Sequence, residues 1–322
     1  MDACASGYTV GVDVGGTKTA YGLFDGGGEP VSTLRRDSDA TLGPEEFFDN
    51  IVTTIGALCR DNGVGRGSLR GVGIGMPSFI LFDEGRIVKT ANLIKIKDFQ
   101  AKDYLVKKLG GGVGVVLDND ARANALAEHR RGAGRGFPHM LFCPVSTGIS
   151  SGIIIGGKPF RGTYGWSGES GHMIATPGEG LECGCGNRGC YMSWCSGSMI
   201  VRHVQNWIDG GQQTLMTSLA GGSGGVTAVH ISEAFGRGDP MAIRAVEQMA
   251  KYMSVWIFNL YMTFNINCFV FGGGLLGMKV GLMERVRALF DAYNKNDMPV
   301  YFKTAELGEY SGVIGAAELL KD

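Results

Sequence analysis

One imidazole and three thiols lie on a single glycine-rich stretch of the chain. His172 is followed by Cys183, Cys185 and Cys190, the last three within the segment CGCGNRGC. Three cysteine thiolates and one histidine form a closed tetrahedral set of zinc ligands. Because thiols ionise on the metal, zinc can hold such a loop without a core of its own. The spacing therefore predicts a structural zinc ion, and buried free thiols beside an unrelated histidine are the weaker alternative.

The sequence shows no sign of export. Its start, MDACASGYTVGVDVGG, lacks a basic region followed by a long apolar run, so we expect no signal peptide and a cytoplasmic protein. The apolar segment MSVWIFNLYMTFNINCFVFGGG is interrupted by asparagines, which favours a buried helix and strand over a membrane span. A reducing compartment favours metal binding by the clustered thiols. The other cysteines are expected to be core or surface thiols: Cys4, Cys59, Cys143, Cys195 and Cys268.

A glycine turn near the N-terminus has the residues of a phosphate site. In DVGGTK, Gly15 and Gly16 let backbone N–H groups approach a phosphate, and Thr17 adds a hydroxyl donor. Asp13 can hold magnesium through water. The order Thr-Lys, with no helix after it, excludes a Walker loop. Taken alone, a plain β-hairpin explains the segment equally well.

A predicted strand ends in polar residues in the segment GVGVVLDNDARANALAE. Asp120 stands where an open α/β sheet carries catalytic groups, at the end of the strand and the start of a helix. A carboxylate there can accept the proton of an attacking hydroxyl. The alternative is that Asn119 or Asp120 simply caps the helix.

Two further glycine turns lie later in the chain. VSTGISSG places Thr147 and Gly148 in a turn suited to the outer phosphates of a nucleotide. FGGGLLG ends a strand in three glycines that allow close approach of a flat base or ribose: Gly272, Gly273 and Gly274. Each is also consistent with an ordinary tight turn.

The elements that must position these residues alternate between strands and helices, which indicates the α/β class. GPEEFFDNIVTTIGALCRDNG predicts a helix after Gly43, and DPMAIRAVEQMAKYMSVWIFNLYMTF a long amphipathic one. GGQQTLMTSLAGGSGG is expected to be a surface loop. The length of 322 residues suggests two domains with a ligand cleft between them. We expect one domain over 1–120, joined by a helix at about 308–322, and another over 121–307 that carries the zinc loop.

The composition excludes some partners. The formal net charge is −1 and charged residues make up 19% of the chain, so we expect neither nucleic acid nor an anionic membrane as a partner. The 54 glycines have no collagen-like period and indicate many tight turns.

Together these motifs resemble the ROK family of sugar kinases, within the actin-like ATPase superfamily. The similar segments are DVGGTK, GIGMP, ANL, DNDARANALAE, STGISSG, GESGH, CGCGNRGC, FGGGL and GAAEL. The resemblance implies two ribonuclease-H-like domains with an interdomain cleft. It also implies transfer of phosphate from MgATP to the 6-hydroxyl of a hexose or hexose derivative, in a homodimer or homotetramer.

The resemblance also implies residue roles. Asp120 is the expected general base, taking the proton of the 6-hydroxyl as that oxygen attacks the γ-phosphate in line. Residues expected to bind sugar hydroxyls are Asn92, Asn119, Asp120, Glu169 and His172. Residues expected to bind MgATP are Asp13, Gly15, Gly16, Thr17, Lys18, Thr147, Gly148, Gly272, Gly273 and Gly274.

The chain departs from the family pattern in three places. Pro77 is followed by Ser78, where the family has glycine, and serines replace glycines of the second phosphate turn at Ser146, Ser150 and Ser151. The family's Cys-Leu-Glu becomes Cys190-Tyr191-Met192, so a glutamate that binds sugar hydroxyls near the anomeric end is missing.

Two other functions remain open at this point. A sugar-responsive regulator of the same family would carry a winged helix ahead of the DxGGTK strand, but here that strand lies within the first residues. A sugar-binding protein with weak or lost kinase activity is favoured by Met192 and disfavoured by Asp120. Glucose, allose, mannose, fructose and N-acetylated hexosamines all remain candidate sugars.

Overall fold

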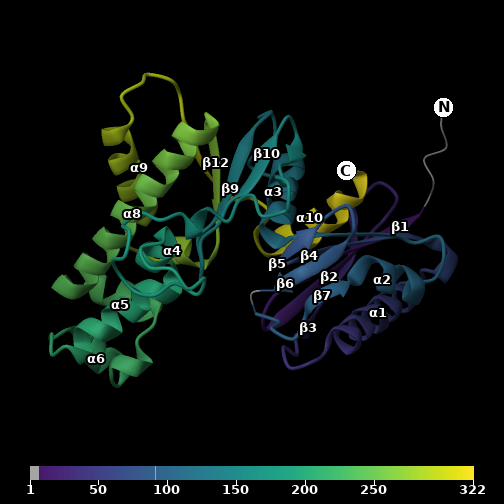
Figure 1. The fold of residues 1–322 in the computed structure, drawn as a ribbon, viewed down its shortest axis with the longest axis horizontal. Helices are drawn as coiled ribbons and strands as arrows, with labels where there is room; N and C mark the ends of the chain where they lie inside the picture. Colours follow the sequence, from purple (N-terminus) through teal and green to yellow (C-terminus); the bar gives the residue numbers. More distant parts are fainter. Residues whose placement is uncertain (1–6, 91) are drawn as a thin grey trace. The chain divides into compact units, whose positions relative to one another are not determined.

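The chain folds into two compact units, each described here by itself (Figure 1). The structure is a computed structural model that describes residues 7–90 and 92–322. Unit 1 contains the chain up to residue 142 together with 152–167 and 305–322, and unit 2 contains 143–151 and 168–304. These bounds differ from the expected domain division at residue 120, which falls inside unit 1.

Unit 1 is built on a five-stranded sheet of order β3-β2-β1-β4-β8. Strands β1, β2 and β3 form an antiparallel meander, whereas β4 and β8 run parallel to β1. The meander places the DVGGTK turn between β1 and β2, and the parallel part directs the end of β8 toward the same edge. The bounds are β1 Tyr8–Val14, β2 Lys18–Phe24, β3 Pro30–Asp37, β4 Leu69–Met76 and β8 Gly114–Asn119.

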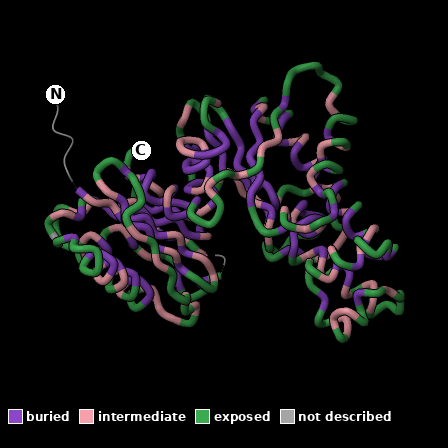
Figure 2. Tube along the Cα trace, turned by 180° about the vertical axis from the view of Figure 1, so that it is seen from behind, coloured by how far each residue is buried: buried purple, intermediate pink, exposed green. Residues whose placement is uncertain are grey.

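Helices α1 (Pro44–Asp61) and α2 (Ala101–Leu109) contribute to the same hydrophobic core as this sheet. The core is formed by branched and aromatic side chains such as Val12, Phe48 and Ile74. Buried residues follow the central strands, whereas the outer helices alternate between buried and exposed positions (Figure 2). As predicted, α1 has proline in its first turn and ends before Asn62.

The closing helix α10 (Ser311–Glu318) packs on β1, β4 and α3 (Asp120–Arg131). Glycines allow this close approach. A Cβ atom at Gly73 would lie 1.7 Å from the carbonyl oxygen of Ala316, and one at Gly315 would lie 1.9 Å from that of Ala123. Only a residue without a side chain fits at such contacts. The end of the chain thus becomes part of the unit that holds its beginning.

Unit 1 also contains a three-stranded sheet and strands of a second five-stranded sheet. One is the antiparallel set β5-β6-β7, in which Ser78 pairs with Thr90 and Phe79 with Lys89. The other joins β9 to β10 and β10 to β11, and β9 continues into unit 2. The bounds are β5 Ser78–Leu81, β6 Arg86–Thr90, β7 Lys97–Gln100, β9 Met140–Pro144, β10 Gly152–Ile155 and β11 Lys158–Pro159.

Unit 2 is mostly helical, with a parallel strand pair formed by β12 and β13. The long helix α8 begins after its cap Asp239 and ends at Asn265, which is in the left-handed conformation. It packs against α4, α5, α7 and α9. The bounds are α4 Tyr191–Cys195, α5 Gly197–Asp209, α6 Leu215–Ala220, α7 Ala228–Gly236, α8 Pro240–Phe264, β12 Cys268–Gly272, α9 Leu282–Tyr293 and β13 Tyr301–Thr304.

The expectation of a surface loop after α5 was wrong, because this segment contains α6. The hydroxyl of Thr214 caps the helix, and the carboxylate of Asp239 accepts hydrogen bonds from Thr214 and from the N–H of Leu215. Met216 is fully buried. A distant cap and one buried side chain thus order a segment whose glycines suggest a loop.

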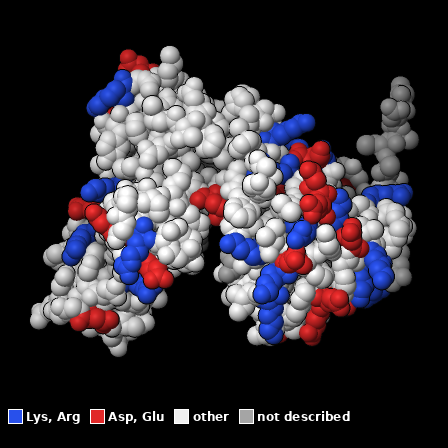
Figure 3. Space-filling model, in the orientation of Figure 1, with Lys and Arg blue, Asp and Glu red and all other residues white. Residues whose placement is uncertain are grey.

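The surface carries mixed charge. On the face shown in Figure 3, basic and acidic side chains alternate over unit 1 without a large area of one sign. Among the described residues, no helix combines the length and apolarity needed to cross a membrane.

Candidate active site

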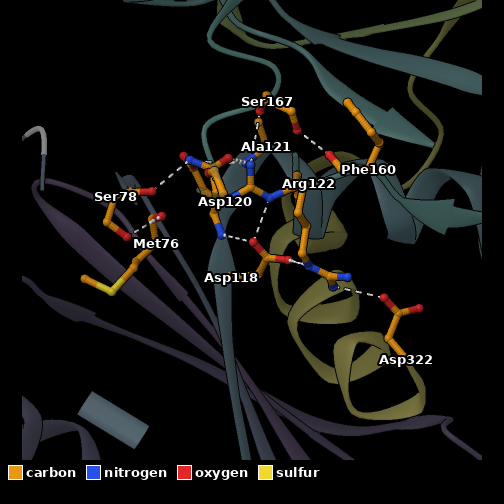
Figure 4. Close-up of polar contacts among 12 residues, drawn as sticks. Met76, Ser78, Asp118, Asp120, Ala121, Arg122, Phe160, Ser167 and Asp322 are labelled. Atoms are coloured by element: carbon orange, nitrogen blue, oxygen red, sulfur yellow. Dashed lines mark hydrogen bonds and ion pairs between the residues drawn. The ribbon is translucent and has the colours of Figure 1, made fainter. Parts of the chain in front are cut away.

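Three consecutive polar residues end β8 and begin α3 (Figure 4). Asn119 is the cap of α3: its side-chain oxygen accepts from the N–H of Ala121 at 2.9 Å, and its amide nitrogen donates to the carbonyl of Ser78 at 3.4 Å. One oxygen of Asp120 accepts from the same N–H at 2.9 Å. The capping alternative is therefore confirmed for Asn119, and the same cap fixes the backbone that carries Asp120.

The loop before β5 contributes the partner of Asn119. Ser78, where the family has glycine, is buried, and its hydroxyl donates to the carbonyl oxygen of Met76 at 3.2 Å. The hydroxyl is thus used within the turn, and the backbone carbonyl of Ser78 faces Asn119.

At the first glycine turn, an amino acid predicted to bind the sugar lies beside one predicted to bind phosphate. The N–H of Gly15 donates to the carbonyl oxygen of Lys18 at 2.9 Å, which closes the turn. A Cβ atom at Gly16 would lie 3.2 Å from the amide nitrogen of Asn92. The adjacent Thr17 and Lys18 are exposed. In the ANL segment, Ala91 lies outside the described residues.

Asp13 lies near the end of β1, just before this turn, and it packs against the first turn of α10. A Cβ atom at Gly312 would come within 2.1 Å of an Asp13 carboxylate oxygen, so only glycine fits there. Sequence reasoning did not connect Gly312 with this site. Residues 312 and 13 are far apart in the chain, and the only signal was the glycine in the closing helix.

Two carboxyl groups at this edge have raised pKa values. Burial and, to a smaller extent, the negative charge of Asp120 raise the pKa of Asp13 to about 7, against the opposing effect of Arg35. Burial also raises the pKa of Asp120, against the hydrogen bond from Ala121 and the charge of Arg122. A carboxylate whose pKa lies closer to neutral pH is a better proton acceptor.

The two glycine turns of unit 2 lie side by side. The carbonyl oxygen of Val145 accepts from the N–H of Leu275, and a Cβ atom at Gly273 would lie 2.5 Å from that oxygen. Gly273 has a φ of 105°, which favours glycine. The carbonyl oxygen of Thr147 accepts from the backbone N–H and the hydroxyl of Ser198, at 3.2 and 2.8 Å. No pattern in the sequence predicted the anchoring role of Ser198.

One serine departure of the second phosphate turn, Ser151, has a structural use. The hydroxyl of Ser151 is buried and lies 2.9 Å from that of Ser170, and it also bonds to the carbonyl oxygen of Gly168 at 3.3 Å. These contacts attach the turn to the segment that leads to Glu169 and His172.

Four predicted metal ligands lie close together in unit 2. The ligand atoms of His172, Cys183, Cys185 and Cys190 are all within 4.8 Å of one another. The Cys183 sulfur is 3.3 Å from the His172 Nδ1 atom, and the Cys185 and Cys190 sulfurs are 3.6 Å apart. A tetrahedral zinc site requires about 3.6 Å and 3.8 Å for such pairs. The four residues therefore fit zinc.

The loop around these ligands is fixed by its backbone. The N–H of Cys183 donates to the carbonyl oxygen of Asn187, and the N–H of Gly186 donates to that of Cys183, both at 2.8 Å. The second ring nitrogen of His172 lies 3.9 Å from a carboxylate oxygen of Glu169. Binding of a metal by Nδ1 would thus fix the ring that faces Glu169.

Tyr191 and Met192 follow the last of these cysteines, at the start of α4. The Tyr191 hydroxyl is 2.6 Å from the side-chain nitrogen of Asn259, and its ring is buried. The terminal methyl of Met192 would lie 3.5 Å from a Cβ atom built at Gly148. The thioether thus lies against the turn of Thr147 and Gly148, in the position where the family has glutamate.

The predicted residues therefore gather in two groups, one in each unit. Unit 1 holds Asp13, Gly15, Gly16, Thr17, Lys18, Asn92, Asn119 and Asp120, and unit 2 holds Thr147, Gly148, Glu169, His172, Cys183, Cys185, Cys190, Gly272, Gly273 and Gly274. Of the other cysteines, Cys59, Cys143, Cys195 and Cys268 are buried, and Cys4 lies outside the described residues.

The raised pKa of Asp13 generates a first prediction. In the protein without ligands, Asp13 should titrate near 7, and Asp120→Asn should lower this pKa because it removes a neighbouring negative charge. The folded state keeps a proton that the unfolded chain loses near pH 4, so the free energy of unfolding should fall as pH rises from about 4 to about 7. Carboxyl carbon NMR measures the pKa, and Asp13→Asn should flatten the pH dependence of stability. Asp103→Asn, an exposed carboxyl in the first turn of α2, is the control, and titration of Asp13 near 4 would contradict this account.

Comparison with known proteins agrees with these motifs. The sequence pattern of the ROK family matches residues 9–322. The chain is 32% identical to a glucokinase from Streptomyces coelicolor, with 98% of each chain covered. It is 26% identical to an N-acetylmannosamine kinase from Haemophilus influenzae, with 97% of this chain and 94% of the relative covered.

Two solved structures are similar over nearly the whole chain. A ROK hexokinase from Thermus thermophilus has a TM-score of 0.83 at 31% identity and covers 98% of this chain and 100% of its own. A ROK family glucokinase from Streptomyces griseus, in complex with glucose and AMPPNP, has a TM-score of 0.77 at 31% identity and covers 97% and 99%. The predicted α/β fold of the actin-like ATPase type is confirmed by these likenesses. This protein therefore belongs to the ROK family, as its motifs predict.

Proposed function

We propose that the protein transfers the γ-phosphoryl group of MgATP to the 6-hydroxyl of a hexose or hexose derivative. Kinases of glucose and of N-acetylmannosamine among its relatives support an ATP-dependent sugar kinase. These relatives give less support to the alternative function, a sugar-binding regulator. The observation that carries the proposal is the position of Asp120, which the cap of α3 fixes at the end of β8.

Asp120 is the general base in this proposal. Its raised pKa suits it to accept the proton of the sugar hydroxyl as that oxygen attacks phosphorus. Phosphoryl transfer otherwise depends on positioning and on neutralising charge, which magnesium supplies when it is bound with ATP. In this proposal the backbone N–H of Gly16 and the hydroxyl of Thr17 bind phosphate oxygens, the N–H of Gly15 closes the turn, and Asn92 beside Gly16 orients the sugar.

Removal of this base gives a second prediction. Asp120→Asn should fold and bind sugar, because Asn119 continues to cap α3, but its kcat should fall by about 10²–10⁴-fold. A coupled assay of ADP release measures the loss, and calorimetric titration with the sugar checks binding. Asp103→Asn serves again as the matched control. Turnover of Asp120→Asn close to that of the parent would remove Asp120 from the mechanism.

We also propose that His172, Cys183, Cys185 and Cys190 hold one zinc ion. The distances among their ligand atoms support a tetrahedral site, and all four positions are filled by protein atoms, so the ion would be structural. Its role is to fix the loop that carries His172 and, three residues before it, Glu169.

Metal analysis tests this role. The purified protein should contain about one zinc per chain by mass spectrometry, as a closed tetrahedral site requires. Cys185→Ser should lose the metal at little packing cost, since Cys185 is exposed. Sugar affinity should fall with it, because the ring of His172 is no longer fixed. Cys59→Ala, at a buried thiol of α1, should keep the zinc, and active protein without zinc would refute the proposal.

Met192 suggests which sugars are preferred. A carboxylate accepts hydrogen bonds from two sugar hydroxyls, each worth about 1.5–3 kcal/mol, whereas a thioether offers only a weak acceptor. Met192 lies against the Thr147–Gly148 turn and makes this part of the unit less polar. We propose weak activity on glucose and preference for a sugar with an N-acyl or glycosidic group, or altered stereochemistry, at the anomeric end.

Restoring the family's glutamate tests this preference. Met192→Glu should raise kcat/KM for glucose by about tenfold or more, the equivalent of one charged hydrogen bond. Met262→Glu, at an exposed position of α8, is the control for added charge. Efficient glucose phosphorylation by the parent, or no gain in Met192→Glu, would show that Met192 does not set the preference. The cytoplasmic location and the homodimer or homotetramer stay predictions.

A further inference from the structure

Arg122 is a charged side chain inside unit 1, with only 2% of its surface exposed. It lies two residues after Asp120 on α3, and its guanidinium bonds in three directions (Figure 4). The Nε atom donates to Asp118 at 2.7 Å, and the two terminal nitrogens donate to the carbonyl oxygens of Ser167 at 3.1 Å and Gly165 at 2.9 Å. One side chain therefore connects the end of β8 with a segment more than forty residues away in the chain.

Its partner Asp118 is fully buried and fully paired. One carboxylate oxygen accepts from Arg122 and from the backbone N–H of Asn119, both at 2.7 Å, and the other accepts from the Nε atom of Arg161 at 2.7 Å. Arg161 also lies over the ring of Phe82, 3.5 Å from its centre. Two guanidinium groups thus pair with the charge of Asp118. Its hydrogen bond from the N–H of Asn119 fixes the backbone immediately before Asp120.

The segment that Arg122 holds lies along β5. Gly165 has a φ of 71°, and a Cβ atom there would lie 2.1 Å from the carbonyl oxygen of Ile80. The ring of Trp166 packs on that of Phe79, with centres 4.9 Å apart. Both neighbours of Trp166 in the chain bond to Arg122, so the guanidinium fixes the position of this ring. The chain reaches Glu169 two residues after Ser167.

These contacts form a closed ring that includes Asp118 and Asn119, the two residues before Asp120. Asn119 bonds to Ser78 at the start of β5, the next residue Phe79 packs on Trp166, and the carbonyls beside Trp166 bond to Arg122, which returns to Asp118. A buried ion pair is seldom needed for stability alone, since well-packed apolar side chains often serve as well. The planar fork of arginine gives fixed directions, which a site with exact geometry requires.

We propose that Arg122 is a positioning residue for sugar phosphorylation. It holds the Gly165–Ser167 segment, with Trp166, in a fixed relation to the strand end that carries Asp120. The segment leads to Glu169, so we expect Arg122 to affect the binding of the sugar. None of its hydrogen bonds reaches the nucleotide turn at Gly15 and Gly16, so the binding of ATP should not depend on it. The proposal rests on the proposed function, in that the residues it positions are those assigned to the sugar.

The variant Arg122→Lys tests this role, because lysine keeps the charge but cannot bond to both carbonyls and to Asp118. A misplaced site raises the KM for sugar, and we expect about tenfold, with the KM for ATP changed less than about twofold. The probe is glucose or N-acetylmannosamine, whichever the parent phosphorylates faster. Arg131→Lys is the matched control: it is the same substitution on the same helix, at a residue that pairs with Glu318 outside the ring. A merely structural role would lower the unfolding temperature without separating the two KM values.

A second variant disturbs the other end of the same contact. Gly165→Ala should push the segment away from β5 and reproduce the rise in sugar KM, and it decides the matter if Arg122→Lys does not fold. Hydrogen exchange of the amides of residues 162–168 should become faster in either variant and stay unchanged in Arg131→Lys. This readout needs no sugar, so it tests the positioning even if the parent phosphorylates neither probe, a result that would count against the proposed function alone. Unchanged exchange, or equal rises in the KM values for sugar and ATP, would overturn the proposal.

Discussion

The burial of the Asp118 carboxylate at the end of β8 is the constraint on which the rest of unit 1 near the site depends. A buried charge is costly unless it is paired and hydrogen-bonded, and here it is satisfied by Arg122, Arg161 and the N–H of Asn119. The N–H of Asn119 belongs to the end of β8, Arg122 to the start of α3, and Arg161 to the segment after β11. Satisfying one carboxylate therefore fixes a strand end, a helix start and a distant segment at once.

Each of the three residues at the end of β8 and the start of α3 has a different role: Asp118, Asn119 and Asp120. The first holds the backbone, the second caps α3 and bonds to Ser78, and the third is left as a partly buried carboxylate with a raised pKa. Asp13 faces the same edge from β1, where the close approach of α10 at Gly312 partly buries it. Polar groups with structural partners thus surround the group proposed to do chemistry.

The sequence predicted those features that depend on neighbouring residues. The bounds of α1 followed from its proline and acidic first turn, α8 from its periodicity, and the clustering of His172 with three cysteines from the cysteine spacing. Contacts between distant residues were not predictable. Nothing in the segment RGTYGWSG indicates that Arg122 holds two of its carbonyls, and α6 owes its order to Asp239. The sheet β5-β6-β7 was also missed, because its strands have only four or five residues each and are too short to show a clear period.

The central claim is that the protein phosphorylates a sugar with ATP at a primary hydroxyl. The most direct measurement is ³¹P NMR of the protein with MgATP and each sugar of a panel of hexoses and N-acetylated hexosamines. A sugar kinase of this kind should form a phosphate monoester with at least one sugar as ADP appears, and its phosphorus should couple to the two protons of carbon 6. Release of inorganic phosphate alone, or no reaction with any sugar of the panel, would contradict it.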